Sequence, residues 1–231
     1  MDNKKINNDL LAFWDDALKL SNEDKKEMQN EEGFDYKELA PSQKLFVAAS
    51  SLGKCHKVLD YGCGNGWGAI IANKSGCQDV EAIDLGENII DAVKFYADVF
   101  GAKINAHVIS IDWLKNNAKQ EYDGIICSNV LDVVPLETAE EIIQGLARIS
   151  LPDANVVIGL NYYFPLDKAK ERGMDVREDK YLFMDNVLRL LSLKDEEWID
   201  LFTPYFEIVK LDYFAWPNEE QERRLFYLRK K

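Results

Sequence analysis

The sequence has few residues that bind metals or form disulfides, and no long hydrophobic run. Its 231 residues include two histidines and four cysteines, and the cysteines form no C-x-x-C pair. This pattern argues against a zinc site or a disulfide scaffold and favours a reduced intracellular protein. No stretch approaches the roughly 20 apolar residues of a membrane-spanning helix, and the N-terminal MDNKKINNDLLAFWDD lacks the apolar core of a signal peptide. We therefore expect a cytoplasmic protein with no metal and no membrane partner.

Basic residues are also scarce relative to acidic ones. The chain has 28 Lys and Arg against 41 Asp and Glu, a net charge of −13. Because nucleic-acid binding depends on neutralising phosphates, this balance disfavours a nucleic-acid partner. One compact basic cluster stands near the end of the sequence, and we interpret it as charged residues that flank a terminal strand: Arg223, Arg224, Arg229, Lys230 and Lys231.

Apolar strands and amphipathic helices alternate through the middle of the chain. Periodicity predicts strands at 58–60, 79–84, 104–109, 122–127 and 155–160, and helices at 42–51, 67–73, 87–100 and 136–149. Such alternation indicates βαβ units, a mostly parallel sheet and helices on both faces. The expected fold class is α/β, doubly wound and Rossmann-like.

The two ends of the chain depart from this alternation. Residues 1–40 predict amphipathic helices that form a lid or appendage, and 41–231 form the main domain. An insertion at about 161–193 begins with a polar, aromatic-rich segment, and residues 187–193 and 195–202 are predicted to be helical. The alternating runs 206–214 and 224–228 predict an antiparallel terminal hairpin.

The stretch Val58–Ala72, VLDYGCGNGWGAIIA, is the most informative part of the sequence. Glycines at 62, 64, 66 and 68 follow a short strand and precede a helix, an arrangement that lets backbone approach a ligand closely. The spacing differs from the G-x-G-x-x-G of dinucleotide sites, although Asp84 is suitably placed for one. Asp60, just before the glycines, favours a ribose or a cationic ligand over a phosphate.

Polar residues follow the later strands as well. Asp84 ends the second strand, Asp112 and Trp113 follow the third, and Ser128 and Asn129 follow the fourth. In an open α/β sheet ligands bind beyond these carboxyl ends. Acidic groups there can accept hydrogen bonds from ribose or bind an ammonium, and Asp112 with Trp113 suits an adenine.

This set of residues resembles the class I S-adenosylmethionine-dependent methyltransferases, over about residues 42–163 and more loosely in the terminal hairpin. The resemblance implies a seven-stranded sheet with a reversed final strand and S-adenosylmethionine as cofactor, which leaves as S-adenosylhomocysteine. It implies that the glycine turn contacts the methionine part, Asp84 the ribose, Asp112 and Trp113 the adenine, and the loop at Ser128 and Asn129 the sulfonium. The cofactor-binding set expected from it is Asp60, Tyr61, Gly62, Gly64, Gly66, Asp84, Leu85, Asp112, Trp113, Ser128 and Asn129.

The substrate class is narrowed by a missing motif. Methylases of amide or exocyclic nitrogens usually carry N/D-P-P-Y/F after strand four, where this chain has Ser128–Leu131. The run NVLDVVP resembles the N-x-L-H-H-x-P-like loop of small-molecule methylases, with Asp132 and Val133 in place of two histidines. Asp132 is the candidate general base, and a turn or helix-capping role is the alternative.

A small-molecule acceptor is the expected substrate, and its pocket is expected to include Trp14, Tyr162 and Tyr163. The protein is expected to be a monomer or a homodimer. Two other functions remain open from the sequence: a protein that binds the cofactor without catalysis, and a protein or RNA methyltransferase. A nicotinamide dehydrogenase is the least favoured reading.

Overall fold

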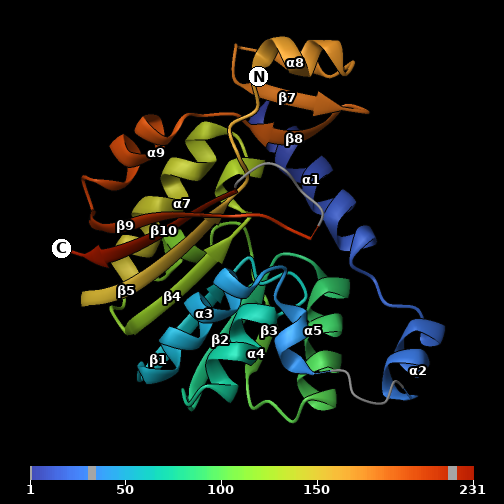
Figure 1. Ribbon diagram of the computed structural model, residues 1–231, viewed down its shortest axis with the longest axis vertical. Helices are drawn as coiled ribbons and strands as arrows, with labels where there is room; N and C mark the ends of the chain where they lie inside the picture. The colour runs from blue at the N-terminus through green and yellow to red at the C-terminus, as the bar shows by residue number, and fades with distance from the viewer. Residues whose placement is uncertain (1, 31–34, 218–222) are drawn as a thin grey trace.

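Seven strands form the central sheet of the protein (Figure 1). The computed structural model describes residues 2–30, 35–217 and 223–231. The strands lie in the order β3 (Asn105–Val108), β2 (Asp79–Asp84), β1 (Lys57–Tyr61), β4 (Tyr122–Ser128), β5 (Ser150–Leu160), β10 (Arg223–Lys230) and β9 (Phe206–Phe214). Neighbouring strands from β3 to β5 are parallel, whereas β10 is antiparallel to both β5 and β9.

This topology confirms the expected Rossmann-like fold and its antiparallel terminal hairpin. The connection of that hairpin includes residues 218–222, which lie outside the described part of the chain. Strands β2 and β3 lie on one side of β1, and β4 and β5 lie on the other. The strand order therefore reverses between β1 and β4, which is where a ligand cleft is expected in such a sheet.

Helices cover both faces because apolar residues alternate along the central strands. Val58 packs with α3 (Gln43–Ser51), α4 (Trp67–Lys74) and α5 (Glu87–Val99) on one face. Leu59 packs in the opposite core with α7 (Leu136–Ile149) and α9 (Asp195–Phe202). Leu114 of the short α6 (Trp113–Asn116) joins this second core, and three 3₁₀ turns complete the connections: Tyr36–Leu39, Leu52–Lys54 and Leu131–Val133.

The N-terminal segment forms the two expected helices, α1 (Asn3–Ala17) and α2 (Asn22–Asn30). Ile6 and Leu10 anchor α1 in the core beside α7. The start of α2 is fixed by a reciprocal pair: the Asp24 N–H donates to Ser21 Oγ at 3.1 Å, and the Ser21 N–H donates to Asp24 Oδ2 at 2.8 Å. Helix α1 contacts both α5 and β8 (Val187–Leu191), a strand of the insertion (Figure 1).

The insertion after β5 folds as α8 (Leu166–Glu171) and a small antiparallel sheet of β6 (Asp175–Arg177), β7 (Tyr181–Met184) and β8 (Val187–Leu191). The predicted helix at 187–193 is wrong, because this segment is β8. Asp185 and Asn186 have φ of 53° and 61°, and two successive residues of positive φ form the tight turn of a β-hairpin. That turn pairs β8 with β7, while the predicted helix at 195–202 is confirmed as α9.

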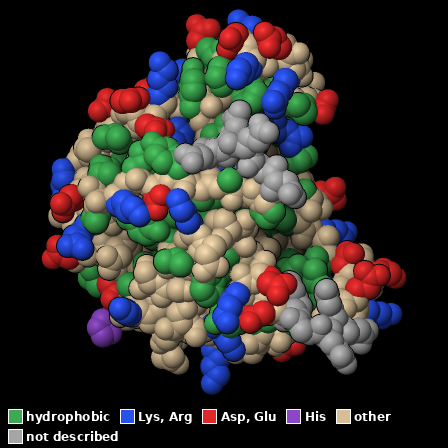
Figure 2. Space-filling model, in the orientation of Figure 1, with side chains coloured by type: hydrophobic (Ala, Val, Ile, Leu, Met, Phe, Trp, Pro, Cys, Tyr) green, Lys and Arg blue, Asp and Glu red, His purple; other side chains and the backbone are tan. Residues whose placement is uncertain are grey.

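On the face drawn in Figure 2, Lys and Arg side chains are interspersed with Asp and Glu rather than gathered in one patch. None of the described helices combines the length and the apolar character needed to cross a bilayer.

Candidate functional site

The glycine turn after β1 adopts a conformation that other residues would strain. Gly62, Gly64 and Gly66 have φ of 64°, 53° and 78°, values in the left-handed region that glycine adopts without cost. The N–H of Gly62 and the N–H of Cys63 both donate to the Ile83 carbonyl, at 2.9 and 3.1 Å. The turn is thereby held against the end of β2, with its backbone at the carboxyl edge of the sheet.

Asp60, the last buried residue of β1, connects the strand to the helix that follows the turn. Its Oδ2 accepts a hydrogen bond from the Ala69 N–H in the first turn of α4 at 2.8 Å. A Cβ at Gly68 would lie 2.9 Å from that oxygen, so a side chain there would displace the carboxyl group. Burial raises the pKa of Asp60 to about 8; the Ala69 N–H opposes the rise and the charge of Asp84 adds to it.

An Asp60→Asn variant is expected to be less sensitive to rising pH than the wild type. The pKa of about 8 in the folded, ligand-free protein exceeds the roughly 3.9 of an unfolded aspartate. The stability that Asp60 contributes is therefore fully present below about pH 4 and is lost as the pH rises toward 8, by up to about 1.4 kcal/mol per unit. Urea unfolding should show that the free energy of unfolding of the variant, relative to that of the wild type, rises by roughly 1–3 kcal/mol between about pH 5.5 and about pH 7.5. A difference that stays constant with pH would contradict this.

Asp84, at the end of β2, faces the glycine turn. Its Oδ2 accepts from the Gly64 N–H at 3.2 Å, and its Oδ1 accepts from the N–H groups of Leu85 and Gly86 at 2.7 and 3.4 Å. Burial is the main cause that raises the pKa of Asp84; these three N–H groups lower it and the charge of Asp15 raises it. The carboxylate is thus fixed in orientation beside the turn.

Helix α1 reaches this edge through a residue that the sequence analysis did not select. Asp15 Oδ1 accepts from the N–H groups of Asn88 and Ile89 at 2.8 and 3.3 Å, and its Oδ2 accepts from Asn88 Nδ2 at 2.8 Å. The N-cap residue of α5, Gly86, makes no side-chain capping bond. Asp15 therefore caps α5 from another helix, and it holds the end of α1 close to the glycine turn, where Leu18 Cδ1 is 3.9 Å from a Cβ built on Gly64.

Removing this cap with Asp15→Ala should cost about 1 kcal/mol, the usual loss for an N-cap carboxylate. The larger effect should be a local increase in hydrogen exchange, because α1 and the first turn of α5 lose the contact that joins them. Hydrogen exchange followed by mass spectrometry should show faster exchange in both segments. Asp16→Ala is the matched control, since Asp16 is exposed on the same helix; equal exchange in the two variants would refute the capping role.

The other expected cofactor residues lie at neighbouring strand ends. Asp112 precedes α6 after β3, with its side chain 60% exposed and 3.8 Å from Lys115 Nζ. Trp113 beside it is partly buried and packs against the same core as Tyr61 and Leu85. The structure therefore brings this pair to the same edge of the sheet as Asp84, in a more open position.

The loop after β4 is fixed by Asn129. Its φ of 57° is positive, which asparagine tolerates better than most residues. Its N–H donates to the Gly159 carbonyl at 2.8 Å, its Oδ1 accepts from Ser128 Oγ at 3.2 Å, and its Nδ2 donates to Asn161 Oδ1 at 3.2 Å. The next residue, Val130, lies very close to Gly62: a Cβ built on Gly62 would be 2.4 Å from Val130 Cγ2. The loop and the glycine turn therefore form one continuous wall.

Asp132 does not face an open pocket. It is 0% exposed, and its Oδ2 accepts from the Asn161 N–H. Arg224, which is also buried, donates from Nε to the Asn161 carbonyl at 2.8 Å and from Nη1 to Asp195 Oδ1 at 3.3 Å. Burial raises the pKa of Asp132, while the Asn161 N–H and the charge of Arg224 lower it. This geometry holds the end of β5, and it does not fit a base that must reach an acceptor.

The expected acceptor-pocket residues are dispersed. Tyr162 packs on Phe164, with ring centroids 5.9 Å apart, in a small satellite cluster. Tyr163 lines an open hollow on the insertion side, with Lys194 Nζ 6.0 Å from its ring centroid. Trp14 on α1 is 39% exposed and packs edge-on against Phe13. Of the three, only Tyr162 is adjacent in sequence to Asn161, which contacts Asn129.

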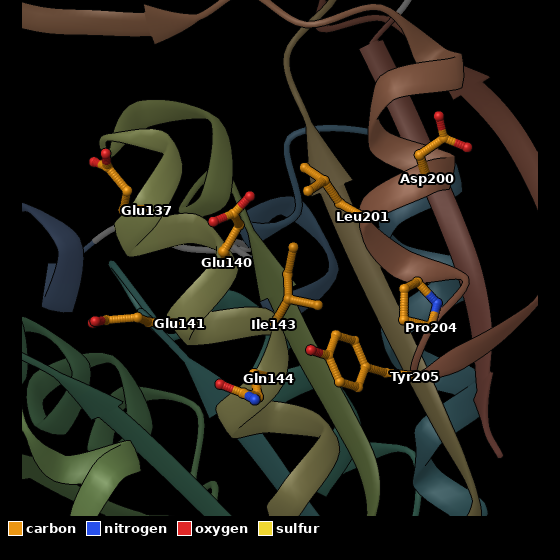
Figure 3. Close-up of a pocket in the computed structure, with 9 residues that line it drawn as sticks. All are labelled: Glu137, Glu140, Glu141, Ile143, Gln144, Asp200, Leu201, Pro204 and Tyr205. Atoms are coloured by element: carbon orange, nitrogen blue, oxygen red, sulfur yellow. The ribbon is translucent and has the colours of Figure 1, made fainter.

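A cavity of ≈ 470 Å³ lies elsewhere, between α7 and the end of α9 (Figure 3). Carboxylates of Glu137, Glu140 and Glu141 line one side and Asp200 the other, with Tyr205 and Pro204 beside them. None of the expected site residues lines this cavity. The carboxyl edge of the sheet, where the expected residues lie, therefore remains the candidate site.

Part of this chain is similar to known methyltransferases. Residues 58–153, from β1 into β5, match the family described as "Methyltransferase domain". A ribosomal protein L11 methyltransferase of Thermotoga neapolitana is 25% identical over 162 residues, covering 68% of this chain and 53% of that protein. A ubiquinone biosynthesis O-methyltransferase of Rickettsia canadensis is 34% identical over 104 residues, covering 44% and 41%. The chain thus spans about half the length of these curated relatives.

Solved structures share the fold over more of the chain. Magnesium protoporphyrin IX methyltransferase from Synechocystis PCC 6803, with bound S-adenosylhomocysteine, superposes with a TM-score of 0.66 at 16% identity, covering 95% of this chain and 99% of that one. The 1,6-didemethyltoxoflavin-N1-methyltransferase of Burkholderia thailandensis gives 0.65 at 16% identity, covering 83% and 79%. At such identities the likeness supports the fold.

Proposed function

We propose that this chain is a class I S-adenosylmethionine-dependent methyltransferase that transfers a methyl group from S-adenosylmethionine to a small-molecule acceptor. The observation that carries the proposal is the edge formed by β1, β2 and β4. There a glycine turn of positive φ, a fixed carboxylate and a polar loop converge at the switch point of the sheet.

The residues present fit the cofactor. The carboxylate of Asp84 accepts hydrogen bonds from three backbone N–H groups. Because the two oxygens of a carboxylate can accept about four hydrogen bonds, Asp84 can also accept one from a ribose hydroxyl. The glycine turn places main chain where the methionine part would lie. Asp112 and Trp113 would hold the adenine, with Tyr61 and Leu85 along the same wall and Ser128 and Asn129 at the sulfonium end.

When bound, S-adenosylmethionine supplies a methyl group on a positively charged sulfur that is already a good leaving group. The protein must then mainly align the acceptor and exclude water, and alignment alone can supply effective molarities of about 10⁵–10⁸ M. Two contacts suit the exclusion of water: Val130 packs against Gly62, and Leu18, which follows α1, lies beside Gly64. We propose that residues 1–40 act as the lid and 161–193 shape the acceptor side.

We propose a positioning role for Asp132 instead of the base role. It holds the Asn161 backbone with Arg224, and Asn161 in turn contacts Asn129 beside the proposed sulfonium position. An acceptor that is already anionic, or that gives its proton to water, needs no protein base.

A protein acceptor is the second candidate, because the relative that covers 68% of the chain is named as a ribosomal protein methyltransferase. The missing N/D-P-P-Y/F tetrad and the net charge of −13 favour the small molecule. A protein that binds the cofactor without catalysis is the third.

Incubation with S-adenosylmethionine labelled in its methyl group separates these functions. Labelled product should form in a protein-free metabolite extract and not in a ribosomal protein fraction. Label found in protein would support the second candidate, and cofactor binding with no labelled product in either fraction would support the third.

A further inference from the structure

Helix α1 contacts two regions to which the proposed function gives separate roles. Its end, residues 13–18, lies at the cofactor edge, where Asp15 accepts hydrogen bonds from the N–H groups of Asn88 and Ile89 at 2.8 and 3.3 Å. Leu18 follows the helix and lies beside Gly64 of the glycine turn. The same helix contacts β8 of the insertion (Figure 1). One helix therefore connects the cofactor edge to the segment proposed to shape the acceptor side.

Phe13 makes a specific contact with the insertion. The guanidinium carbon of Arg189, in β8, lies 3.9 Å from the centroid of the Phe13 ring, a distance typical of a cation–π pair. Arg189 Nε is buried and has no hydrogen-bond partner in the part of the chain that the structure describes, so the ring is an important contact for this side chain. Residues two positions apart on a helix do not face each other, which allows Phe13 to contact β8 while Asp15 contacts α5.

The end of α1 is held less firmly than the rest of the helix. Both buried residues of the helix precede this end, whereas Trp14 and Asp16 within it are exposed. Burial is the main cause that raises the pKa of Asp84, and the charge of Asp15 raises it further, which indicates that the two carboxylates lie close enough to repel each other. That repulsion opposes docking of the end of α1 in the ligand-free protein.

We propose that α1 couples the cofactor site to the insertion. A ribose hydroxyl that donates to Asp84 weakens its repulsion of Asp15, so a bound cofactor favours the docked position of the end of α1. The docked end keeps Phe13 against Arg189 and thereby orders the three-stranded sheet of the insertion. The acceptor side is then complete only after the cofactor has bound. This inference rests on the proposed function and adds an order of binding to it.

Hydrogen exchange followed by mass spectrometry tests the coupling, using the full chain with and without saturating S-adenosylhomocysteine. The ligand should slow exchange in the glycine turn, at the end of α1 and also in β7 and β8. In the two strands the slowing should be roughly 5- to 100-fold, the usual range for coupling between two sites. If α1 is only a structural support, β7 and β8 exchange equally with and without the ligand, and that result would overturn the proposal.

Variants then assign the coupling to the contact between α1 and β8. In Phe13→Ala, and separately in Arg189→Gln, the ligand should still slow exchange in the glycine turn but should no longer slow it in β7 and β8. Asp16→Ala is the matched control, because Asp16 is exposed at the same end of α1, and it should keep the full response. A response of β7 and β8 that survives in either folded variant of the pair would overturn the route through Phe13.

Calorimetric titration with S-adenosylhomocysteine separates the two levels of the argument. No binding by the wild-type protein would count against the proposed function. Saturable binding with unchanged exchange in β7 and β8 would leave the proposed function intact and would overturn the coupling alone.

Discussion

An Asp84→Ala variant is expected to bind S-adenosylmethionine roughly 100-fold more weakly than the wild type. The substitution removes the acceptor proposed for the ribose hydroxyls, and charge-assisted hydrogen bonds contribute about 1.5–3 kcal/mol each. It also releases the N–H groups of Gly64 and Leu85 that now orient the turn. Calorimetric titration with S-adenosylmethionine and S-adenosylhomocysteine measures the effect directly.

Asp79→Ala is the matched control, because Asp79 begins the same strand β2 at the opposite edge of the sheet and is exposed. Its affinity for the cofactor should equal that of the wild type. A full-affinity Asp84→Ala protein with native thermal stability would mean that the ribose lies elsewhere.

Asp132 should prove important for stability and dispensable as a base. Asp132→Ala leaves the Asn161 N–H without its acceptor, and an unsatisfied buried donor costs about 1–3 kcal/mol. For a domain of this size that corresponds to a fall in Tm of about 2–12 °C. Thermal unfolding followed by circular dichroism measures it.

The isosteric Asp132→Asn separates the two roles. It keeps an oxygen acceptor for the Asn161 N–H, so the methyl-transfer rate kcat should stay within about 10-fold of the wild type once an acceptor is known. A loss of 1000-fold or more in kcat, with the fold intact, would restore Asp132 as the general base.

Much of the sheet could be predicted because its signals are local. The run at 79–84 and the amphipathic pattern at 136–149 carry their periodicity within a single segment, and both elements have the predicted bounds. The glycine turn was recognisable for the same reason, since alternate glycines between a strand and a helix are contiguous in sequence. The fold followed from these segments and is confirmed, and residues 58–153 match a methyltransferase domain family.

The insertion was harder to predict because pairing decided its structure. The leucine-rich Val187–Leu191 suits a helix by propensity, yet its pairing with β7 makes it a strand. Asp185 and Asn186, at the turn between the strands, were the signal that could have indicated a hairpin.

The parts of the site that sequence reasoning missed depend on long-range contacts. Asp15 and Asn88 lie 73 positions apart, and Arg224 contacts Asn161 only because β10 returns antiparallel beside β5. The surroundings of Asp132 have the same origin, since its hydrogen-bond donor Asn161 follows β5 and the charge that acts on it belongs to Arg224 of β10. The basic cluster at 223–231 was correctly placed on a terminal strand, but its first two residues, Arg223 and Arg224, are buried instead of exposed to water.

The central claim is that the carboxyl edge of β1, β2 and β4 holds S-adenosylmethionine. Calorimetric titration of the wild-type protein with S-adenosylhomocysteine tests it most directly. We predict saturable binding at one site per chain with a dissociation constant of about 1–100 μM, or about −8 to −5.5 kcal/mol. No heat of binding and no thermal stabilisation at millimolar S-adenosylhomocysteine would contradict the account.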